Sequence, residues 1–437
     1  MGSPRGIEPV PDRLRALGFL DLSLLWGNLG VSLLVLVAGT YLVPALSLPQ
    51  AFLAILLGSL LGNAMLAVAG LIGADGRVPA MVLLRAPLGR RGSWGPTVLN
   101  AAQCLGWSIF ELLIIATAAA ALSDELFGFR AQWLWTIVFG GVALALALLG
   151  PVDLVRRLVR RFAVWAVLAS LVYLTYWGLD GAGLGDLWDR PGEGGLTVLE
   201  GVDLVVSITV SWIPLAADYT RFGRDRRSAF WGTGLGYLAT SIWLWGLGAI
   251  LFFSRDLTDA AALPAAIAAG GLAATLALVA VTVDETDETF ANVYSAAVTA
   301  QNVAPRVPQR VLIVAVAALA TLGALTIDLL AYETFLLLLG SFFVPLFGVL
   351  LADWLVAGTR YREEDIFDGP AVRPGMIAAW IAGFALYQWL NPVGPSWWTN
   401  AVERLGPPDL GLGASIPSFA LSLALGMAVA RLSRRRL

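Results

Sequence analysis

Long apolar runs separated by short arginine-bearing segments are the feature that most constrains this chain. The hydrocarbon core of a bilayer needs about 20 mainly apolar residues per helix. Twelve stretches approach that requirement, and they cover residues 20–46, 51–73, 98–122, 132–150, 162–178, 202–219, 229–253, 272–303, 311–331, 334–357, 375–391 and 414–431. Only 14% of the 437 residues are charged, whereas a soluble domain averages about 25%, so this chain could not solvate its own surface in water. The sequence therefore predicts an all-α polytopic membrane protein with about 12 transmembrane helices.

The arginines are distributed unevenly between the two sides of the predicted membrane. All 28 basic residues are arginine. With a cytoplasmic N-terminus, only four of them would face the outside: Arg130, Arg190, Arg255 and Arg404. An excess of basic residues in cytoplasmic loops sets the orientation of membrane proteins. The pattern predicts an even number of spans in the inner (plasma) membrane, with both termini cytoplasmic.

Two apolar stretches are too short to span a bilayer. Residues 78–84 lie between Arg77 and Arg85, and residues 260–269 are closed by a pair of glycines. Both are expected to form short interfacial or re-entrant helices.

The composition argues against an enzyme and against a nucleic-acid partner. The net charge is only −3, and no basic stripe interrupts the apolar runs. The chain has no histidine, which removes the usual catalytic base and the usual proton relay near neutral pH. The single cysteine, Cys104, can form neither an internal disulfide nor a metal cluster and is expected to pack within its helix. The polar, proline-containing start does not read as a signal peptide, so the first span is expected to stay in the mature protein.

Polar residues within hydrocarbon are costly, and they are therefore candidates for function. In the first span, Gly27 and Gly30 flank Asn28. Glycines around an asparagine favour local unwinding, which turns backbone carbonyls toward a cavity. Close helix packing through small residues explains the same pattern equally well.

The third span carries Gln103, Trp107 and Glu111, spaced four residues apart and so on one helical face. Glu111 lies near the bilayer midplane, where an acidic residue costs roughly 2.5–3.5 kcal/mol. An indole one turn from a carboxylate suits a planar heterocycle, because Trp107 can stack on the ring while Glu111 accepts its N–H groups. The alternative is an interhelical hydrogen bond to Glu111, with Trp107 serving only in packing.

The sixth span contains Pro214, which has no N–H and should break the helix near its middle. Trp212 lies at that break. Asp218 and Arg221 follow at the cytoplasmic end, where a structural ion pair or gate is expected.

The eighth span holds four carboxylates between residues 284 and 288. In one interpretation the helix ends at Val283 and an acidic cytoplasmic loop follows. In the other, a single long helix runs from Leu272 to Val303, and its acidic turn faces a wet cavity. Physical arguments from the residues alone leave both open.

Several separated motifs together resemble the nucleobase:cation symporter-1 family, and more narrowly its cytosine/purine permease branch, which includes hydroxymethylpyrimidine transporters. They occur in the expected order over the first ten helices. The motifs are Gln103–Trp107 followed by Phe110-Glu111, Ala217–Phe222, Asp284-Glu285 through Phe290–Ser295, and Gly340–Gly348 with Ala352-Asp353.

The resemblance implies a LeuT-type core of two inverted five-helix repeats followed by two peripheral helices, and it favours the continuous eighth helix. The implied division is a cytoplasmic segment at 1–19, a first repeat at 20–178, an extracellular loop at 179–201, a second repeat at 202–357, peripheral spans at 358–431 and a cytoplasmic tail at 432–437.

The resemblance also implies a substrate site. Family members stack their substrate on aromatic residues of the third and sixth spans and hydrogen-bond it from the third and eighth. By position these are Trp107, Glu111, Trp212 and Asn292. Gln103 of the third span and Asn28 of the first complete the candidate substrate-binding set.

The family's cation site uses backbone carbonyls of the first helix and hydroxyls of the eighth. This implies cation-binding roles for Gly27, Gly30, Val283, Thr286 and Asp287, with sodium at Thr286 and Asp287. Because Asp287 falls where some relatives carry a second hydroxyl, the choice between sodium and protons stays open.

These observations together lead to one functional hypothesis. The chain is expected to be a monomeric secondary transporter that imports a nucleobase-like heterocycle, such as cytosine, a purine or hydroxymethylpyrimidine, with a sodium ion or proton as coupling ion and no cofactor. The alternative is a sodium symporter for an amino acid or another small organic solute on the same fold.

Overall fold

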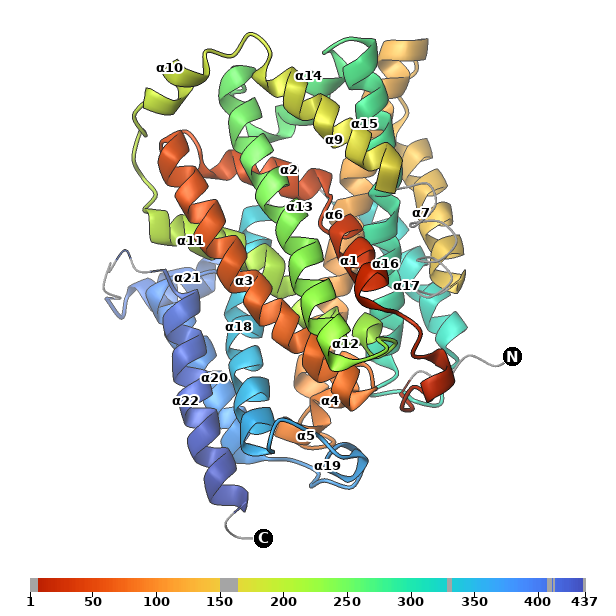
Figure 1. Ribbon diagram of the computed structural model, residues 1–437, viewed down its shortest axis with the longest axis vertical. Helices are drawn as coiled ribbons and strands as arrows, with labels where there is room; N and C mark the ends of the chain where they lie inside the picture. The colour runs from red at the N-terminus through yellow and green to blue at the C-terminus, as the bar shows by residue number, and fades with distance from the viewer. Residues whose placement is uncertain (1–6, 150–163, 328–331, 407–410, 412, 435–437) are drawn as a thin grey trace.

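A computed structural model describes residues 7–149, 164–327, 332–406, 411 and 413–434, and in this part of the chain the regular secondary structure is helical (Figure 1). The helices are η1 (Asp12–Leu14), α1 (Phe19–Asn28), α2 (Leu33–Gly39), η2 (Thr40–Leu42), α3 (Leu48–Gly76), α4 (Ala80–Leu83), α5 (Arg85–Leu88), α6 (Trp94–Phe127), α7 (Gln132–Leu149), α9 (Val164–Leu179), α10 (Leu184–Asp189), α11 (Val198–Ser211), α12 (Ile213–Thr220), α13 (Arg226–Ser254), η4 (Ala260–Ala262), α14 (Leu263–Ala268), α15 (Leu272–Asp284), α16 (Thr286–Ala300), α17 (Gln309–Ala324), α18 (Tyr332–Val356), α19 (Glu363–Phe367), α20 (Pro374–Leu390), α21 (Ser396–Glu403) and α22 (Ser415–Arg434).

In its described part, each of the twelve apolar stretches coincides with one to three helices. Among the described residues, seven helices are long and apolar enough to cross a bilayer, or eight if the bent pair α1–α2 forms one span. α9 and α17 are apolar but shorter. The arginines expected between the fourth and fifth spans, Arg156, Arg157, Arg160 and Arg161, lie outside the described residues. The two short stretches form α4–α5 and η4–α14, as expected for segments that cannot span.

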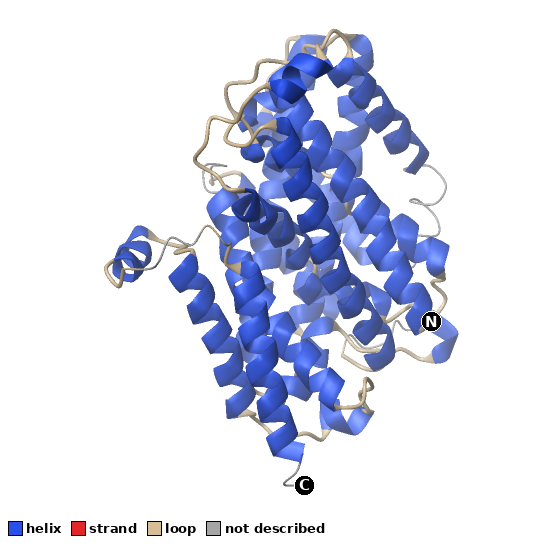
Figure 2. Cartoon of the chain, turned by 60° about the vertical axis from the view of Figure 1, so that its left-hand side comes forward, coloured by secondary structure: helices blue, strands red, loops and turns tan. Residues whose placement is uncertain are grey.

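The spanning helices pack as two groups. The core group consists of α1–α2, α3, α11–α12 and α13, which contact one another extensively. The scaffold group consists of α6, α7, α15–α16 and α17. α9 links the groups by packing on both α13 and α15, while α18 packs between α11 and α22. α20 and α22 lie together at one side of the molecule in both views (Figures 1 and 2).

Three spans are interrupted near the middle of the protein. α1 and α2 meet at an angle of 63° across a break at residues 29–32. α11 gives way to α12 at Trp212, two residues before Pro214, where the proline removes one backbone donor. α15 and α16 are separated only by Glu285. The break predicted in the sixth span is confirmed, and of the two interpretations of the first span the structure shows the unwound one.

The acidic turn of the eighth span is buried. Asp284, Glu285 and Glu288 are 6%, 0% and 5% exposed, so the interpretation as an acidic cytoplasmic loop is wrong. The span runs on from α15 into α16 past one irregular residue, Glu285. The structure therefore agrees with the single long span that the resemblance favoured, except that its helix is interrupted at Glu285.

Glycines allow α2 to lie directly against α13. A Cβ atom at Gly248 of α13 would overlap with the carbonyl oxygen of Leu36, and one at Gly39 of α2 would overlap with the carbonyl oxygen of Trp245. In the break before α2, a Cβ at Gly30 would overlap with the hydroxyl of Thr240 on α13. The two backbones can approach this closely only because these positions have no side chain. Packing therefore explains Gly30 in addition to unwinding.

We expect Gly248→Ala to lower the thermal unfolding temperature of the detergent-solubilised protein, because overpacking a close backbone contact typically costs about 1–3 kcal/mol. The matched control is Gly141→Ala in α7, where an added Cβ meets no atom within 4 Å. Since alanine favours a helix over glycine by about 1 kcal/mol, the control should be unchanged or stabilised. Equal unfolding temperatures for the two variants would contradict the proposed packing role of Gly248.

Candidate substrate site

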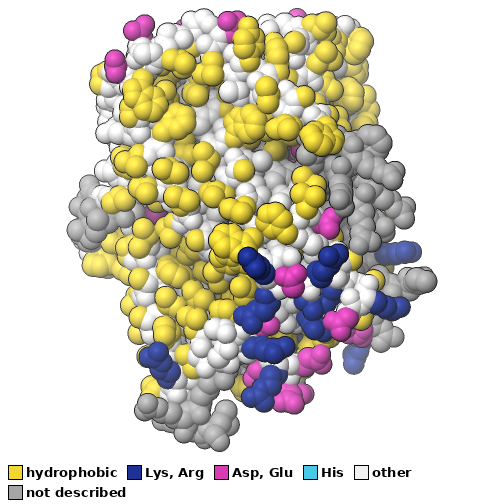
Figure 3. Space-filling model, in the orientation of Figure 1, with side chains coloured by type: hydrophobic (Ala, Val, Ile, Leu, Met, Phe, Trp, Pro, Cys, Tyr) yellow, Lys and Arg dark blue, Asp and Glu magenta, His cyan; other side chains and the backbone are white. Residues whose placement is uncertain are grey.

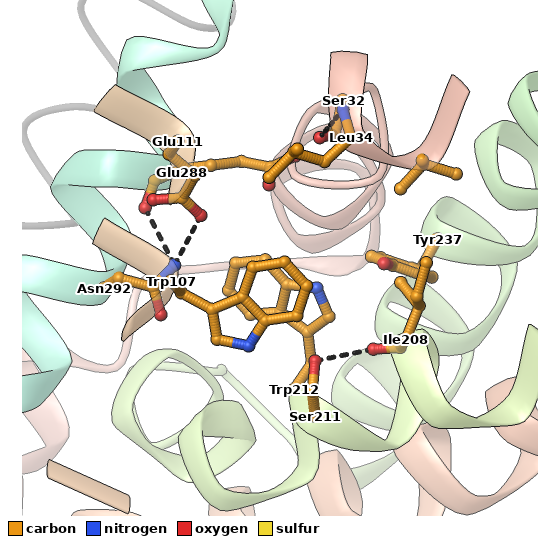
Figure 4. Close-up of a pocket in the computed structure, with 11 residues that line it drawn as sticks. Ser32, Leu34, Trp107, Glu111, Ile208, Ser211, Trp212, Tyr237, Glu288 and Asn292 are labelled. Atoms are coloured by element: carbon orange, nitrogen blue, oxygen red, sulfur yellow. Dashed lines mark hydrogen bonds between the residues drawn. The ribbon is translucent and has the colours of Figure 1, made fainter. Parts of the chain in front are cut away.

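A narrow cavity lies where the core group meets the scaffold group. It is lined by Ser32, Leu34, Val35, Trp107, Glu111, Ile208, Ser211, Trp212, Tyr237, Glu288 and Asn292 (Figure 4). The lining residues come from α2, the end of α11 and α13 on one side, and from α6 and α16 on the other. Two of the three helix interruptions, those at Ser32 and Trp212, open directly onto it.

Two tryptophans supply the aromatic surfaces of the cavity. Trp212 lies at the α11–α12 break, and its ring meets Trp26 edge-on at 5.8 Å and Tyr237 at 6.4 Å between centroids. Trp107 of α6 packs edge-on against Phe335 at 5.4 Å. Edge-to-face contacts of this kind hold aromatic rings in defined orientations. Both indoles are therefore held by neighbouring rings while they line the cavity.

The polar wall of the cavity is formed by α6 and α16. Asn292 Nδ2 donates to Glu111 Oε1 at 2.7 Å and to the backbone oxygen of Glu288 at 3.3 Å (Figure 4). Glu111 is fully buried. A buried carboxylate accepts hydrogen bonds strongly, and because both Nδ2 hydrogens of Asn292 are directed at Glu111 and Glu288, its Oδ1 is also an acceptor. The wall can thus recognise a ring that carries N–H donors.

Four of the six predicted substrate-binding residues, Trp107, Glu111, Trp212 and Asn292, line this cavity. Gln103 does not; its Nε2 donates to the Ser211 backbone oxygen at 2.8 Å and to Asn100 Oδ1 at 3.1 Å. The Gln103 amide thus satisfies a carbonyl beside the break in the sixth span.

Asn28 also lies away from the cavity lining. Its Nδ2 donates to Asp284 Oδ1 at 3.1 Å, which connects the end of α1 to the end of α15. Asn28 therefore joins the two helix groups.

The structure adds Ser32, Ser211, Tyr237 and Glu288 to the polar lining. The sequence contained a signal for Glu288, which lies one turn before Asn292 on the same helical face. It contained none for Tyr237, because the sequence of α13 is that of an ordinary apolar span, and only its packing beside α1 and α2 brings this side chain to the cavity.

Glu285 joins the interrupted eighth span to the interrupted first span. Ser32 Oγ donates to Glu285 Oε1 at 2.7 Å, and the Leu33 backbone N–H donates to Oε2 at 2.7 Å. Leu33 is the first residue of α2, so the carboxylate binds at the positive end of that helix. The break in the first span is therefore stabilised by a charge from the scaffold group.

The predicted cation-binding residues lie around this junction. Gly27 lies in the last turn of α1 and Gly30 in the break that follows; both face α13, and an added side chain would overlap with it at Gly30. Thr286 Oγ1 donates to the Val283 backbone oxygen at 2.6 Å. Asp287 lies in α16, and its side chain is outside the described part of the structure. The structure thus brings the two helical segments together, and the cation-binding roles stay predictions.

The expected ion pair between Asp218 and Arg221 takes a different form. Asp218 Oδ1 accepts from the backbone N–H of Ala80, the first residue of α4, at 3.0 Å. Arg221 donates to the Asp218 backbone oxygen and to the Tyr294 hydroxyl at 3.1 Å. Asp218 therefore holds the short helix α4 beneath α12.

We expect Glu285→Ala to destabilise the protein by about 1–3 kcal/mol, since it leaves the buried donors of Ser32 and Leu33 without this acceptor. Thermal unfolding in detergent measures the loss, and hydrogen exchange should show faster opening of α2. Glu403→Ala, at an exposed position of α21, serves as the control. Unfolding temperatures that match this control would show that the bond does not stabilise the break.

Comparison with known proteins identifies the family to which this chain belongs. Residues 9–386 match the family described as permease for cytosine/purines, uracil, thiamine, allantoin. A hydantoin permease of Microbacterium maritypicum is 26% identical over 377 residues, which cover 81% of this chain and 76% of the relative.

The fold is also found in solved structures. The structure of Mhp1, a nucleobase-cation-symport-1 family transporter in a closed conformation with bromovinylhydantoin bound, superposes with a TM-score of 0.82 at 21% identity, covering 100% of this chain and 96% of Mhp1. MhsT in complex with L-phenylalanine gives a TM-score of 0.61 at 13% identity, covering 94% of this chain and 98% of MhsT. These likenesses show a LeuT-type fold. The match over residues 9–386 shows that the chain belongs to the nucleobase:cation symporter-1 family, whose members are permeases for cytosine, purines and related compounds.

Proposed function

We propose that this protein imports a planar nitrogen heterocycle across the inner membrane by cation-coupled alternating access. The observation that carries the proposal is the cavity itself: two tryptophans and a Glu111–Asn292 pair meet between the core group and the scaffold group. A flat ring stacked on the indoles would present its edge to the polar wall.

The polar wall favours a substrate with N–H donors. Two carboxylates, Glu111 and Glu288, line the cavity, and as carboxylates they only accept hydrogen bonds. Cytosine, purines and hydantoin-like rings, which are named for the family and for the hydantoin permease, carry donors of this kind. A ring edge that carries only acceptors could not donate a hydrogen bond to either carboxylate. The site should therefore bind rings with N–H donors in preference to such rings.

Alternating access requires the two groups to separate on one side of the substrate at a time. Hydrogen bonds cross the boundary at Asn28–Asp284, Ser32–Glu285 and Gln103–Ser211. Helices of one group pack on one another far more extensively than they do across the boundary, as α1 does on α13 and α16 on α6. Hydrogen bonds can exchange with water as the boundary opens, whereas separating packed apolar helices exposes area to water.

A cation at the junction of α1 with α15–α16 would couple its gradient to this motion. Thr286 and the Val283 backbone oxygen supply oxygen atoms on α15–α16, and the end of α1 is held against them through Asn28. Oxygen ligands and the ends of broken helices suit sodium. Buried carboxylates in the same turn would equally serve a proton.

The distribution of arginines supports a proposal for the orientation of the protein in the membrane. Arginines gather at one end of the face that Figure 3 shows, below a broad apolar surface, and basic residues of membrane proteins concentrate on the cytoplasmic side. We therefore assign that end to the cytoplasm. From the LeuT-type fold we propose that the two inverted repeats comprise residues 20–178 and 202–357. We further propose that the protein functions as a monomer.

We expect Glu111→Gln to weaken binding of cytosine or hydantoin about 30-fold, because hydrogen bonds to a charged group contribute about 1.5–3 kcal/mol. Calorimetric titration of the purified protein and uptake into proteoliposomes measure the effect. Glu125→Gln makes the same change at an exposed position of α6 and should bind as the wild type does.

A competition panel separates this proposal from its rival. Nucleobases and hydantoins should displace the labelled ligand, and amino acids such as phenylalanine should not. Displacement by amino acids alone would favour a sodium symporter for organic solutes, and unchanged affinity in Glu111→Gln would remove the proposed role of this carboxylate.

We expect Thr286→Ala to raise the sodium concentration that half-saturates heterocycle binding at least tenfold if sodium is the coupling ion, since one oxygen ligand is lost. The control is Thr326→Ala, where an exposed hydroxyl bonds only its own helix. Binding that is independent of sodium but varies with pH in both proteins would assign the coupling to protons.

A further inference from the structure

An open pocket of about 440 Å³ lies at the end of the molecule where the arginines gather (Figure 3). It shares no lining residue with the candidate substrate site. Its lining includes six arginines: Arg15, Arg77, Arg224, Arg226, Arg227 and Arg360. The pocket is formed by the segment before α1, the end of α3, the start of α13 and the loop after α18.

Two of these arginines are held in place by the backbone. Arg15 donates to the carbonyl oxygens of Gly223 at 3.1 Å and Ala74 at 3.3 Å. Arg226 donates to the Thr359 carbonyl oxygen at 2.9 Å and lies over the Trp354 ring at 5.6 Å. The charges of these two arginines are therefore fixed before any ligand binds, which gives the pocket a permanent positive potential.

The pocket carries more positive than negative charge. Asp12 pairs with Arg77 at 3.0 Å and with Arg15 at 3.6 Å, while Asp75 lies 3.8 Å from Arg226 and 4.0 Å from Arg360.

Asp225, the other aspartate that lines the pocket, forms no ion pair within 4 Å with Arg224 or Arg227. Asp225 uses its carboxylate to cap α13 at the Ser228 N–H, a bond that lowers the pKa of Asp225. Within the described residues, Arg224 and Arg227 form no ion pair within 4 Å. Burial, and then the neighbouring Arg77, lower the pKa of Arg15, as expected where positive charges are in excess.

An apolar groove adjoins this pocket. Arg227 lines both, and the groove is otherwise formed by Phe19 of α1 with Ser228, Trp231 and Leu235 of α13. Phe19, Trp231 and Leu235 are 46%, 48% and 46% exposed. The role of basic loops in orienting a membrane protein accounts for arginines at this end. It does not require the apolar groove that begins at Arg227.

We propose that this composite site binds an anionic phospholipid of the adjoining leaflet. The phosphate of the headgroup would lie on Arg224 and Arg227, and an acyl chain would lie along Phe19, Trp231 and Leu235. Charge complementarity selects an anionic headgroup, and the continuous apolar groove selects a lipid over a soluble anion. Because α1 and α13 both belong to the core group, the lipid would be seated on that group alone.

Native mass spectrometry of the full-length protein tests this site, with phosphatidylglycerol and phosphatidylethanolamine of identical acyl chains added in turn. The wild type should retain phosphatidylglycerol in preference. Arg224→Gln/Arg227→Gln should weaken its retention roughly 30-fold, because each arginine near an anionic lipid contributes a factor of about five. The matched control is Arg306→Gln/Arg310→Gln near the start of α17, which removes the same charge outside the pocket and should retain the lipid as the wild type does.

A second variant and a soluble competitor identify the source of the phosphate. Trp231→Gln leaves the arginines intact and should reduce phosphatidylglycerol retention about fivefold through the groove alone. Excess glycerol 1-phosphate should not displace the lipid. Displacement by glycerol 1-phosphate, with no effect of Trp231→Gln, would show a soluble anion site and overturn the proposal. Equal losses in the two arginine double variants would also overturn it, because only bulk charge would then be involved.

Discussion

The need to satisfy backbone polar groups inside hydrocarbon governs the centre of this protein. Water is not available there to replace a missing helical hydrogen bond, so every interruption of a span needs a partner from elsewhere. Glu285 supplies that partner for the break between α1 and α2 by accepting from Ser32 and from the Leu33 N–H. Gln103 does the same for the carbonyl of Ser211 beside the break in the sixth span. Both side chains come from the scaffold group and both breaks lie in the core group, so local unwinding is possible only where the two groups meet.

This requirement explains why the cavity lies at the boundary between the groups. Breaks expose backbone atoms and end helices, and both features create room for polar recognition. The two groups divide the recognition, because Trp212 and Ser32 belong to the core group whereas Trp107, Glu111 and Asn292 belong to the scaffold group. A ligand bound between them would contact both groups at once. Relative movement of the groups would then change the ligand's access without requiring the helices themselves to refold.

The close packing of the core group complements this arrangement. Gly39 and Gly248 allow α2 and α13 to touch along their backbones, and α3 packs against both α11–α12 and α13. A group held together by such contacts can move as one body. The arginine pocket and its apolar groove lie on α1 and α13 at the end of this same body, where a bound lipid would move with the core group and not with the scaffold.

The sequence by itself determined the helical class, the twelve apolar stretches and the break near Pro214, because bilayer thickness, helix length and proline chemistry act locally along the chain. It left the break at residues 29–32 open, because glycines around Asn28 suit unwinding and close helix packing equally well. It also placed Trp107 and Glu111 on one helical face, since that periodicity is a property of a single helix. Only the tertiary structure decided that Glu285 is buried against α2, that Tyr237 reaches the cavity, and that Gln103 and Asn28 do not. The physical reason is that periodicity specifies the direction of a side chain from its own helix axis, whereas its partner depends on which distant helix packs there.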